Sequence, residues 1–449
     1  MKTIFKNLWN RRRQNAWLFI ELIVVTALSW VLADFVVVSF ADTSMPMGFD
    51  VDRLAVVNIK SLTPEAPGYD AEADTSAKKI TAIHAVMSKV RAYPGVKRAT
   101  NLFNYSMIGA NSRMTSNFDT GNDARDTVAK MHASLYYMPG EEFFETYGIE
   151  SLPGSPSIEE ISKTRYQTYG DLVISRQLGE VYWPGENAIG KRVVTNGWQV
   201  RSQGADTVWG TVRAVVDGVR WHSMDRTYAV QYICSGTLDD LTPDRYGDVN
   251  ELNVVMRLRD GVDMDDFLQE FRQWANTDLR IDNFYVLSVK PYADIIYDTE
   301  ESYGVHTERN LQMLLALFFL LNLVLGTVGS FWLQTRKRVE EIGVRRAYGA
   351  RRRHIVGMLL GESWVLTTIS VLTGVLLYLQ WAVRNSLNNG FGNNGDLNLV
   401  DNWVSHFGEH FAIISVIVYV IILACVLVGT LIPAISASRV NVTDALRDE

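Results

Sequence analysis

The stretch WLFIELIVVTALSWVLADFVVVSF, residues 17–40, decides the fold class, because it is apolar over the length that a helix needs to cross a bilayer, about 20 residues. Its charged residues are Glu21 and Asp34. A charge is costly in hydrocarbon, so we expect each to face a neighbouring helix or to lie near the membrane boundary. A cleaved signal peptide would have a shorter apolar region and a small-x-small site. We therefore predict a transmembrane helix at 17–40, after a short segment 1–16.

Three more apolar stretches of similar length follow a long polar interval. They predict transmembrane helices at 311–333, 355–382 and 411–432. The interval 41–310 has the composition of a water-soluble domain, so the mean hydropathy of zero is an average of two unlike parts. The predicted fold class is a membrane protein with four transmembrane α-helices and a large α+β extracytoplasmic domain between the first and the second.

Lysine and arginine are unevenly distributed between the spans, and their distribution predicts the orientation. Segment 1–16 carries five of them and segment 334–354 carries eight, whereas the loop 383–410 has only Arg384. Basic residues stay on the inner side, so we expect the N-terminus, segment 334–354 and the C-terminal tail 433–449 to be cytoplasmic. The large domain is then periplasmic, and the chain lies in the cytoplasmic (inner) membrane.

Charge and cysteine content exclude several classes of protein. A net charge of −7 argues against a nucleic-acid binder, whose basic surface should dominate. Two cysteines, Cys234 and Cys425, are too few for a disulfide framework or a zinc ribbon. Cys425 also lies inside the last predicted span, so we expect no intramolecular disulfide.

The polar domain has the pattern of mixed α and β structure. Leu54–Lys60 alternates like a strand, and apolar residues recur at helical spacing from about Thr75 to Arg91. Asn253–Leu258, Met264–Trp274 and Phe284–Val289 repeat the pattern as strand, helix and strand. The sequence therefore predicts a weak internal repeat of two strand–helix–strand units.

Two motifs resemble binding or catalytic sites but lack required parts. Gly185–Lys191 has the spacing of a phosphate loop, but Arg192 stands where a Ser or Thr would hold magnesium, and we interpret the segment as a turn. His406, Glu409 and His410 match the H-x-x-E-H zinc pattern. A metalloprotease needs a further ligand, and an interfacial role for Glu409 is simpler. We predict no catalytic, cofactor or metal site in this chain.

The segment TRKRVEEIGVRRAYGARRRH, residues 335–354, is the most informative one. Its spacing favours an amphipathic helix at the inner membrane surface, closed by Gly349, in which Glu341 and Arg345 form an i, i+4 pair. Contact with anionic lipid would explain the basic residues but not the glycines or the glutamates. We therefore expect a docked helix. One stripe of this helix would hold Arg338, Glu341, Arg345 and Arg352.

Residues 338–363, RVEEIGVRRAYGARRRHIVGMLLGES, resemble the signature of MacB/FtsX-type permeases, the membrane subunits of a class of ABC transporters. The family pattern is roughly R-E-I-G-x-R-x-A-x-G-A, followed by a span with a glutamate, here Glu362. Glu340 is a departure, because many members carry arginine there. The outer stretch 173–192 resembles the family's periplasmic core domain, and the tail 433–447 resembles its closing motif. The order of one span, a large domain and three spans agrees with this resemblance.

The resemblance implies a role without chemistry in this chain. Segment 334–354 would be a coupling helix that docks on a separate cytoplasmic ABC ATPase, which binds the ATP and the magnesium. The spans would transmit its movement to the periplasmic domain, for export or extrusion of a peptide, toxin or lipid-like substrate. The alternative is ATPase-driven regulation of a cell-wall hydrolase, with no transported substrate. A membrane-anchored sensor is a third interpretation, but the inward segments are short for an output domain.

The resemblance also implies the site residues and the partners. The ATPase-coupling residues are Glu341, Ile342, Gly343, Arg345, Arg346, Ala347 and Gly349. The intramembrane polar residues are Glu21, Asn322 and Glu362. We expect Asn322 to donate a hydrogen bond to another helix, and Glu362 to bond a neighbouring helix or the coupling segment, with a substrate site as the alternative for Glu362. Besides the ATPase, the expected partners are a second permease copy or a related chain, a periplasmic or outer-membrane partner, and membrane lipid.

Overall fold

The computed structural model describes most of the 449 residues. The described residues are 12–102, 107–109, 114–118, 130–223, 227–240, 250–336, 338–385, 387, 403–404 and 406–438. The chain divides into two compact units, which we call the helical unit and the sheet unit. The helical unit is Met1–Ala41, His306–Gly390 and Asp401–Glu449, and the sheet unit is Asp42–Val305 and Phe391–Val400.

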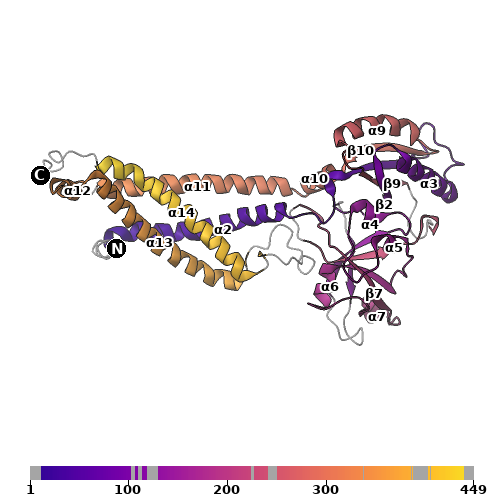
Figure 1. Ribbon diagram of the computed structural model, residues 1–449, viewed down its shortest axis with the longest axis horizontal. Coiled ribbons are helices and arrows are strands. Elements are labelled where there is room, and N and C mark those ends of the chain that lie inside the picture. Colours follow the sequence, from indigo (N-terminus) through magenta and orange to yellow (C-terminus); the bar gives the residue numbers. More distant parts are fainter. Residues whose placement is uncertain are drawn as a thin grey trace. The chain divides into compact units, whose positions relative to one another are not determined.

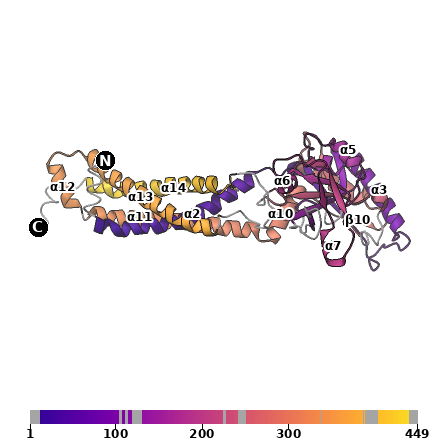
Figure 2. The same ribbon diagram turned by 90° about the horizontal axis from the view of Figure 1, so that it is seen from below.

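The helical unit is built on four long helices that are continuous in every view (Figure 1 and Figure 2). They are α2 (Arg12–Ser44), α11 (Val305–Arg336), α13 (Arg352–Asn385) and α14 (Phe407–Ser438). Each contains one predicted span and extends beyond it at both ends. All four are long and apolar enough to cross a membrane. Together with a unit of mixed α and β structure, they confirm the predicted fold class.

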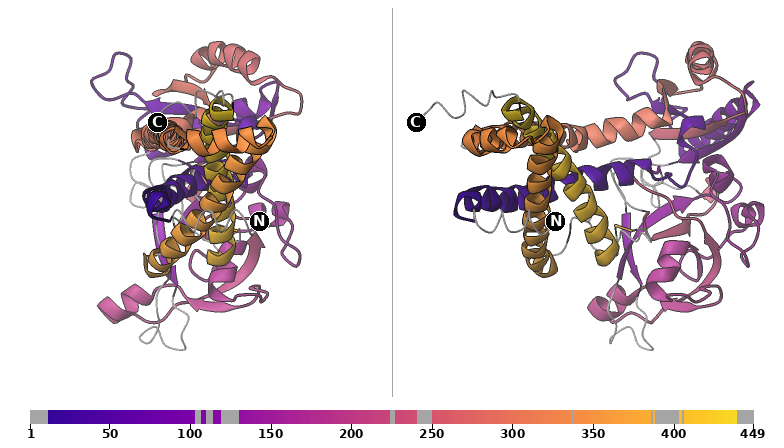
Figure 3. Two further views of the ribbon diagram at one scale, coloured as in Figure 1. Left: turned by 90° about the vertical axis from the view of Figure 1, so that its left-hand side faces the viewer. Right: turned by 60° about the vertical axis from the view of Figure 1, so that its left-hand side comes forward.

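Packing within the helical unit uses small residues and one apolar cluster. Helices α13 and α14 pack against each other and can be followed in Figure 3. Gly374 of α13 lies so close to Thr26 of α2 that an added Cβ would come within 2.8 Å of the threonine Cβ. Glycine at such a crossing lets two helix backbones approach closely. Trp30, Ile414 and Val418 form the buried centre of the cluster.

The first sheet of the sheet unit has the strand order β10-β1-β9-β2, with every neighbouring pair antiparallel. Its strands are β1 (Leu54–Ser61), β2 (Val96–Leu102), β9 (Glu251–Leu258) and β10 (Phe284–Pro291). Helix α3 (Ser76–Ala92) connects β1 to β2, and α9 (Met264–Asp278) connects β9 to β10. This is the β-α-β-β-α-β arrangement of ferredoxin-like folds. The two predicted strand–helix–strand units are therefore interleaved halves of one sheet.

Local sequence explains where these two helices begin and which face they bury. The side chain of Thr75 accepts from the backbone of Lys78 at the start of α3, and Asp263 accepts from two backbone N–H groups at the start of α9. Such N-caps satisfy donors that have no partner inside the helix. Phe267 and Phe271 of α9 are buried in the core cluster that covers this sheet.

The second sheet is inserted between β2 and β9 and has the mixed order β3-β4-β8-β5-β7-β6. Its strands are β3 (Met114–Phe118), β4 (Lys130–Tyr137), β5 (Asp171–Ser175), β6 (Arg192–Val194), β7 (Trp209–Val216) and β8 (Val230–Cys234). The remaining elements of the sheet unit are η1 (Val51–Arg53), α4 (Phe143–Tyr147), α5 (Ile158–Lys163), α6 (Arg176–Tyr182), α7 (Gly197–Gln203), η2 (Leu238–Asp240) and α10 (Tyr292–Ser302).

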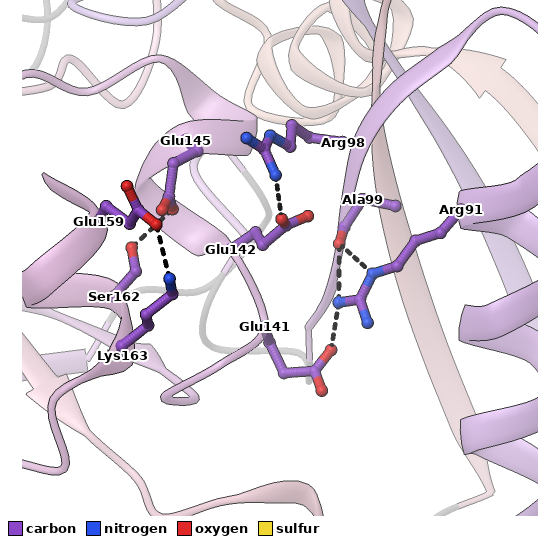
Figure 4. A network of polar contacts seen from close by, with 9 residues as sticks. All are labelled: Arg91, Arg98, Ala99, Glu141, Glu142, Glu145, Glu159, Ser162 and Lys163. Carbon is purple, nitrogen blue, oxygen red and sulfur yellow. Dashed lines mark hydrogen bonds and ion pairs between the residues drawn. The ribbon is translucent and has the colours of Figure 1, made fainter.

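A polar network joins helix α4 to the first sheet (Figure 4). Arg91 of α3 donates to the carbonyl of Ala99 in β2 and, at 2.7 Å, to Glu141, just before α4. Arg98 of β2 pairs with Glu142, the residue that caps α4 in the left-handed conformation. Charge-assisted bonds of this kind are stronger than neutral ones. The first sheet is therefore held to the α4 segment by two adjacent glutamates.

Candidate functional site

The segment between α11 and α13 contains one short helix, α12 (Val339–Ala347). It ends at Tyr348, and the next residue, Gly349, has a φ of +88°. A left-handed φ favours glycine, so Gly349 closes the helix as predicted. The predicted stripe is wrong at one residue, because Arg352 lies at the start of α13 and not on α12. The left-handed turn at Gly349 separates the two helices.

The inner face of α12 packs on its own helical unit. Ile342 is 1% exposed and lies in a cluster with residues of α13 and α14. Those neighbours are Ile355, Leu359, Ala434 and Ala437. Gly343 is buried as well. This face of the helix is therefore covered by the chain itself, and the coupling role of Ile342 and Gly343 stays a prediction in which they hold α12 in place.

Two ion pairs fix the charged residues of α12. Arg338, at its start, pairs with Glu362 of α13 at 2.5 Å, and both side chains are almost fully buried. This contact agrees with the expectation that Glu362 bonds the coupling segment. The predicted pair of Glu341 and Arg345 is present at 2.8 Å, and both side chains are about one-third exposed. The guanidinium of Arg345 also contacts the sulfur of Met358 in α13.

The outer face of α12 carries an exposed apolar pair. Val344 is 43% exposed and Tyr348 is 90% exposed, four residues apart on one face. Around them, Arg346 is half-buried, and the exposed residues are Ala347, Gly349, Arg351, Arg352, Arg353 and His354. An exposed tyrosine among arginines is typical of protein interfaces. The sequence analysis missed Tyr348, although its spacing from Val344 on a basic helix was a signal that could have found it.

The intramembrane polar residues differ in their partners. Glu21 of α2 accepts a hydrogen bond at 3.2 Å from the hydroxyl of Ser330 in α11, so it faces a neighbouring helix as expected. The amide of Asn322 donates at 2.8 Å to the carbonyl of Phe318 in α11 itself, and the side chain is exposed, so its bond to another helix stays a prediction.

A buried pair joins α2 to the start of α14. Asp34 is 3% exposed and His410 is 0% exposed, and their Oδ1 and Nε2 atoms are 2.5 Å apart. The other ring nitrogen of His410 lies 3.1 Å from the carbonyl of Val404. Asp34 therefore faces a neighbouring helix, the first of the two positions expected for it.

The zinc pattern does not form a metal site among the residues that the structure describes. His410 is turned to Asp34, whereas His406 and Glu409 are exposed and lie 3.4 Å apart. In this part of the chain, no three His, Cys, Asp or Glu side chains are grouped as metal ligands. The segment Gly185–Lys191 is the turn between α6 and β6, and Lys191 pairs with Glu186 at 2.6 Å.

Some predicted features lie outside the described residues. They include the closing motif beyond Ser438, the first eleven residues and most of the loop 383–410. The side chain of Glu340 is also outside the described part.

Comparison with known proteins adds to this geometry. Residues 313–442 match the family described as FtsX-like permease C-terminal. The chain is 37% identical over 76 residues to the pyoverdine export ATP-binding/permease protein PvdT of Pseudomonas putida. It is 39% identical over 74 residues to the macrolide export ATP-binding/permease protein MacB of Bdellovibrio bacteriovorus. Each alignment covers 16% of this chain, but only 12% and 11% of those two proteins.

A solved structure is also similar. The periplasmic region of MacB from Actinobacillus actinomycetemcomitans matches with a TM-score of 0.28 and 10% identity, covering 56% of this chain and 94% of that one. The family match at 313–442 includes residues 338–363, and it confirms the resemblance that those residues carry.

Proposed function

This chain belongs to the MacB/FtsX type of permeases through residues 313–442, and we propose that it is the membrane subunit of an ABC transporter. In this proposal, a separate cytoplasmic ATPase binds ATP and magnesium and docks on α12. ATP hydrolysis then moves the helical unit, and the movement reaches the sheet unit. The substrate would be exported or extruded, and the export functions in the names of the two relatives support that direction.

The anchoring of α12 is the observation that carries the proposal. Its inner face is fixed to α13 and α14 by Ile342, and its start is fixed to α13 by the Arg338–Glu362 pair. Its outer face leaves Val344 and Tyr348 exposed. A protein that binds the outer face would therefore push on two long helices at once, and not on a loose loop.

The docking surface can be tested by substitution of Tyr348 and Val344 in the tagged full-length chain. Tyrosine is a frequent hot spot, so Tyr348→Ala should weaken ATPase binding by about 2 kcal/mol, roughly thirtyfold. Val344→Asp should have a similar effect, because it places a charge in an apolar contact. The matched control is Tyr297→Ala, since Tyr297 is an exposed tyrosine of the sheet unit, at 55% exposure.

The measurement is the amount of ATPase that co-purifies with each variant from native membranes. Full ATPase recovery with both α12 variants would rule out this surface as the docking site. Reconstitution of the complex in vesicles then tests the direction of the function. ATP-dependent movement of a peptide or lipid-like probe supports export, whereas ATP-dependent activation of a bound hydrolase without transport would favour the regulatory alternative.

A further inference from the structure

Arg220 lies in the connection between β7 and β8 and is buried, with 1% of its surface exposed. Its guanidinium donates to the backbone carbonyls of Met45 at 2.5 Å, Asp42 at 2.6 Å and Ser223 at 2.5 Å. A buried guanidinium requires such acceptors, because its charge is costly without them. Three backbone carbonyls of the sheet unit, in two segments of the chain, are therefore bound by one side chain.

Two of these acceptors belong to the place where the first span ends. Asp42 is in the last turn of α2, and Met45 follows the helix. The last carbonyls of a helix have no partner inside it and carry a partial negative charge. Arg220 supplies a second donor to the carbonyl of Asp42, which also accepts from the backbone N–H of Met45 at 3.3 Å, and it supplies the opposite charge. It therefore acts as a cap on the end of α2.

The third acceptor, Ser223, is hydrogen-bonded to the helix that precedes the second span. The backbone N–H of Ser223 donates at 2.6 Å to Oε1 of Glu300, which is 2% exposed on α10. Helix α10 ends at Ser302, and α11 begins at Val305. A continuous chain of hydrogen bonds therefore runs from the end of α2, through Arg220 and Ser223, to the helix that precedes α11.

The backbone around Arg220 is also in close contact with the chain that leaves α2. The N–H of Arg220 donates to the carbonyl of Met47 at 2.9 Å. Gly48 has a φ of +79°, and a Cβ at this position would lie 2.2 Å from the carbonyl oxygen of Gly218. The chain that leaves α2 thus lies directly on the connection that carries Arg220. A side chain at position 48 would separate them.

We propose that Arg220 is the positioning residue of a joint through which the end of the first span, α10 before the second span and the six-stranded sheet move together. We call these five residues the Arg220 joint: Asp42, Met45, Arg220, Ser223 and Glu300. The role of ATP in driving this movement rests on the proposed function. The joint itself rests on the contacts above. Lysine could not replace arginine here, because its compact ammonium lacks the planar fork that reaches three carbonyls.

Hydrogen exchange in the full-length chain, reconstituted in lipid nanodiscs, tests the joint without an ATPase. Arg220→Lys should raise exchange by about tenfold in both segment 42–50 and segment 292–304. The matched control is Arg213→Lys on β7, where the arginine is about half exposed and pairs with Asp171 at 2.6 Å. We expect the control to leave both segments unchanged.

Three outcomes would overturn the joint. The first is unchanged hydrogen exchange in Arg220→Lys, and the second is faster exchange in only one of the two segments. The third is faster exchange over the whole sheet unit, which would mean that Arg220 contributes to general stability. If Arg220→Lys fails to fold, Glu300→Gln is used instead. Glutamine still accepts the Ser223 bond but lacks the charge that strengthens it, so both segments should again exchange faster, and an unchanged segment 42–50 would contradict the joint.

A second measurement separates the joint from the proposed function. With the co-purified ATPase bound, the wild type should show an ATP-dependent change of exchange in both segments. Arg220→Lys should keep ATPase binding and lose the ATP-dependent change in the sheet unit. If the wild type shows no ATP-dependent change while the first measurement holds, the joint stands and the proposed function fails.

Discussion

Asp34 and His410 form a buried hydrogen-bonded pair inside the helical unit. A backbone carbonyl can only accept, so Nδ1 of His410 donates to Val404. Nε2 lies 2.5 Å from Oδ1 of Asp34, so the two side chains satisfy each other in apolar surroundings beside Trp30 and Phe411.

Breaking this pair should destabilise the protein in a way that depends on the replacement. Asp34→Ala leaves a buried imidazole without its partner and should cost about 3–5 kcal/mol. Asp34→Asn should cost less, because its amide can donate to a neutral Nε2. Thermal unfolding of the full-length chain in detergent measures both variants, with His406→Ala as the exposed control. Equal losses for alanine and asparagine would contradict the hydrogen bond between the two side chains.

Asp74 should make the sheet unit sensitive to acid. A hydrogen bond from Lys79, at 2.7 Å, and a second one from Tyr69 hold the pKa of Asp74 below its ordinary value of 3.8. The folded state thus binds the proton less readily than the unfolded state. The stabilisation is present above the ordinary pKa and is lost as pH falls through the lower, folded value.

The test compares Asp74→Asn with the wild type over a series of acidic pH values. Near neutral pH the variant should unfold at a lower temperature, because the buried Lys79 loses its counter-charge. The difference in melting temperature should shrink as pH falls below about 4. A difference that stays constant over the series would show that the carboxylate does not supply the acid sensitivity.

Helix α12 should depend on one ion pair much more than on the other. Glu362→Ala leaves Arg338 buried without its carboxylate, at a cost of about 3–5 kcal/mol. Glu341→Ala removes an i, i+4 pair whose side chains are about one-third exposed, worth about 0.3–0.5 kcal/mol. Hydrogen exchange of residues 339–347 in the full-length chain should rise strongly with the first variant and little with the second. Similar exchange in both would mean that Glu362 does not hold the helix in place.

At the scale of the elements, local sequence predicted where helices lie better than which face they bury. The start of α3 at Thr75 and the strand at Leu54 were predicted closely. His84 lies between apolar residues of the predicted helix, but in the structure it is about half exposed and lies 3.0 Å from Asp239. The buried face is set by the neighbouring sheet, and two of its strands come from residues beyond 250.

The same limit applies at the candidate site. The pattern of α12 showed an apolar face, but the residues that cover it include Ala434 and Ala437, some ninety positions away. The spacing of residues within α12 could not distinguish packing of Ile342 on this cluster from contact with a partner protein. Tyr348 was missed for the converse reason, because its 90% exposure depends on what the rest of the chain leaves uncovered.

For the whole molecule, hydropathy and charge were sufficient to predict the fold class, since spans depend on composition over about 20 residues and not on distant contacts. Orientation remains a prediction, and thiol labelling can test it. Tyr169→Cys in the sheet unit and Tyr348→Cys on α12 introduce thiols at positions that are 56% and 90% exposed. The native Cys234 is buried, and Cys425 lies inside α14, so the wild type supplies the background.

A membrane-impermeant maleimide should label Tyr169→Cys in cells whose inner membrane is intact. Tyr348→Cys should react only after that membrane is permeabilised, because lysine and arginine are concentrated around it. Labelling of Tyr348→Cys in intact cells would reverse the proposed orientation.

The pairing of β1 with β9 and β10 has a consequence for biosynthesis. Ala55 lies opposite Met256 and Pro291, so the first strand made has no partner until residues beyond 250 have been translated. At about 5–20 residues per second, that wait is on the order of ten seconds or more. The six-stranded sheet needs only residues 114–234 and can form meanwhile. A largely buried strand thus stays unpaired during synthesis, and a chain that stalls before Glu251 would expose it to aggregation.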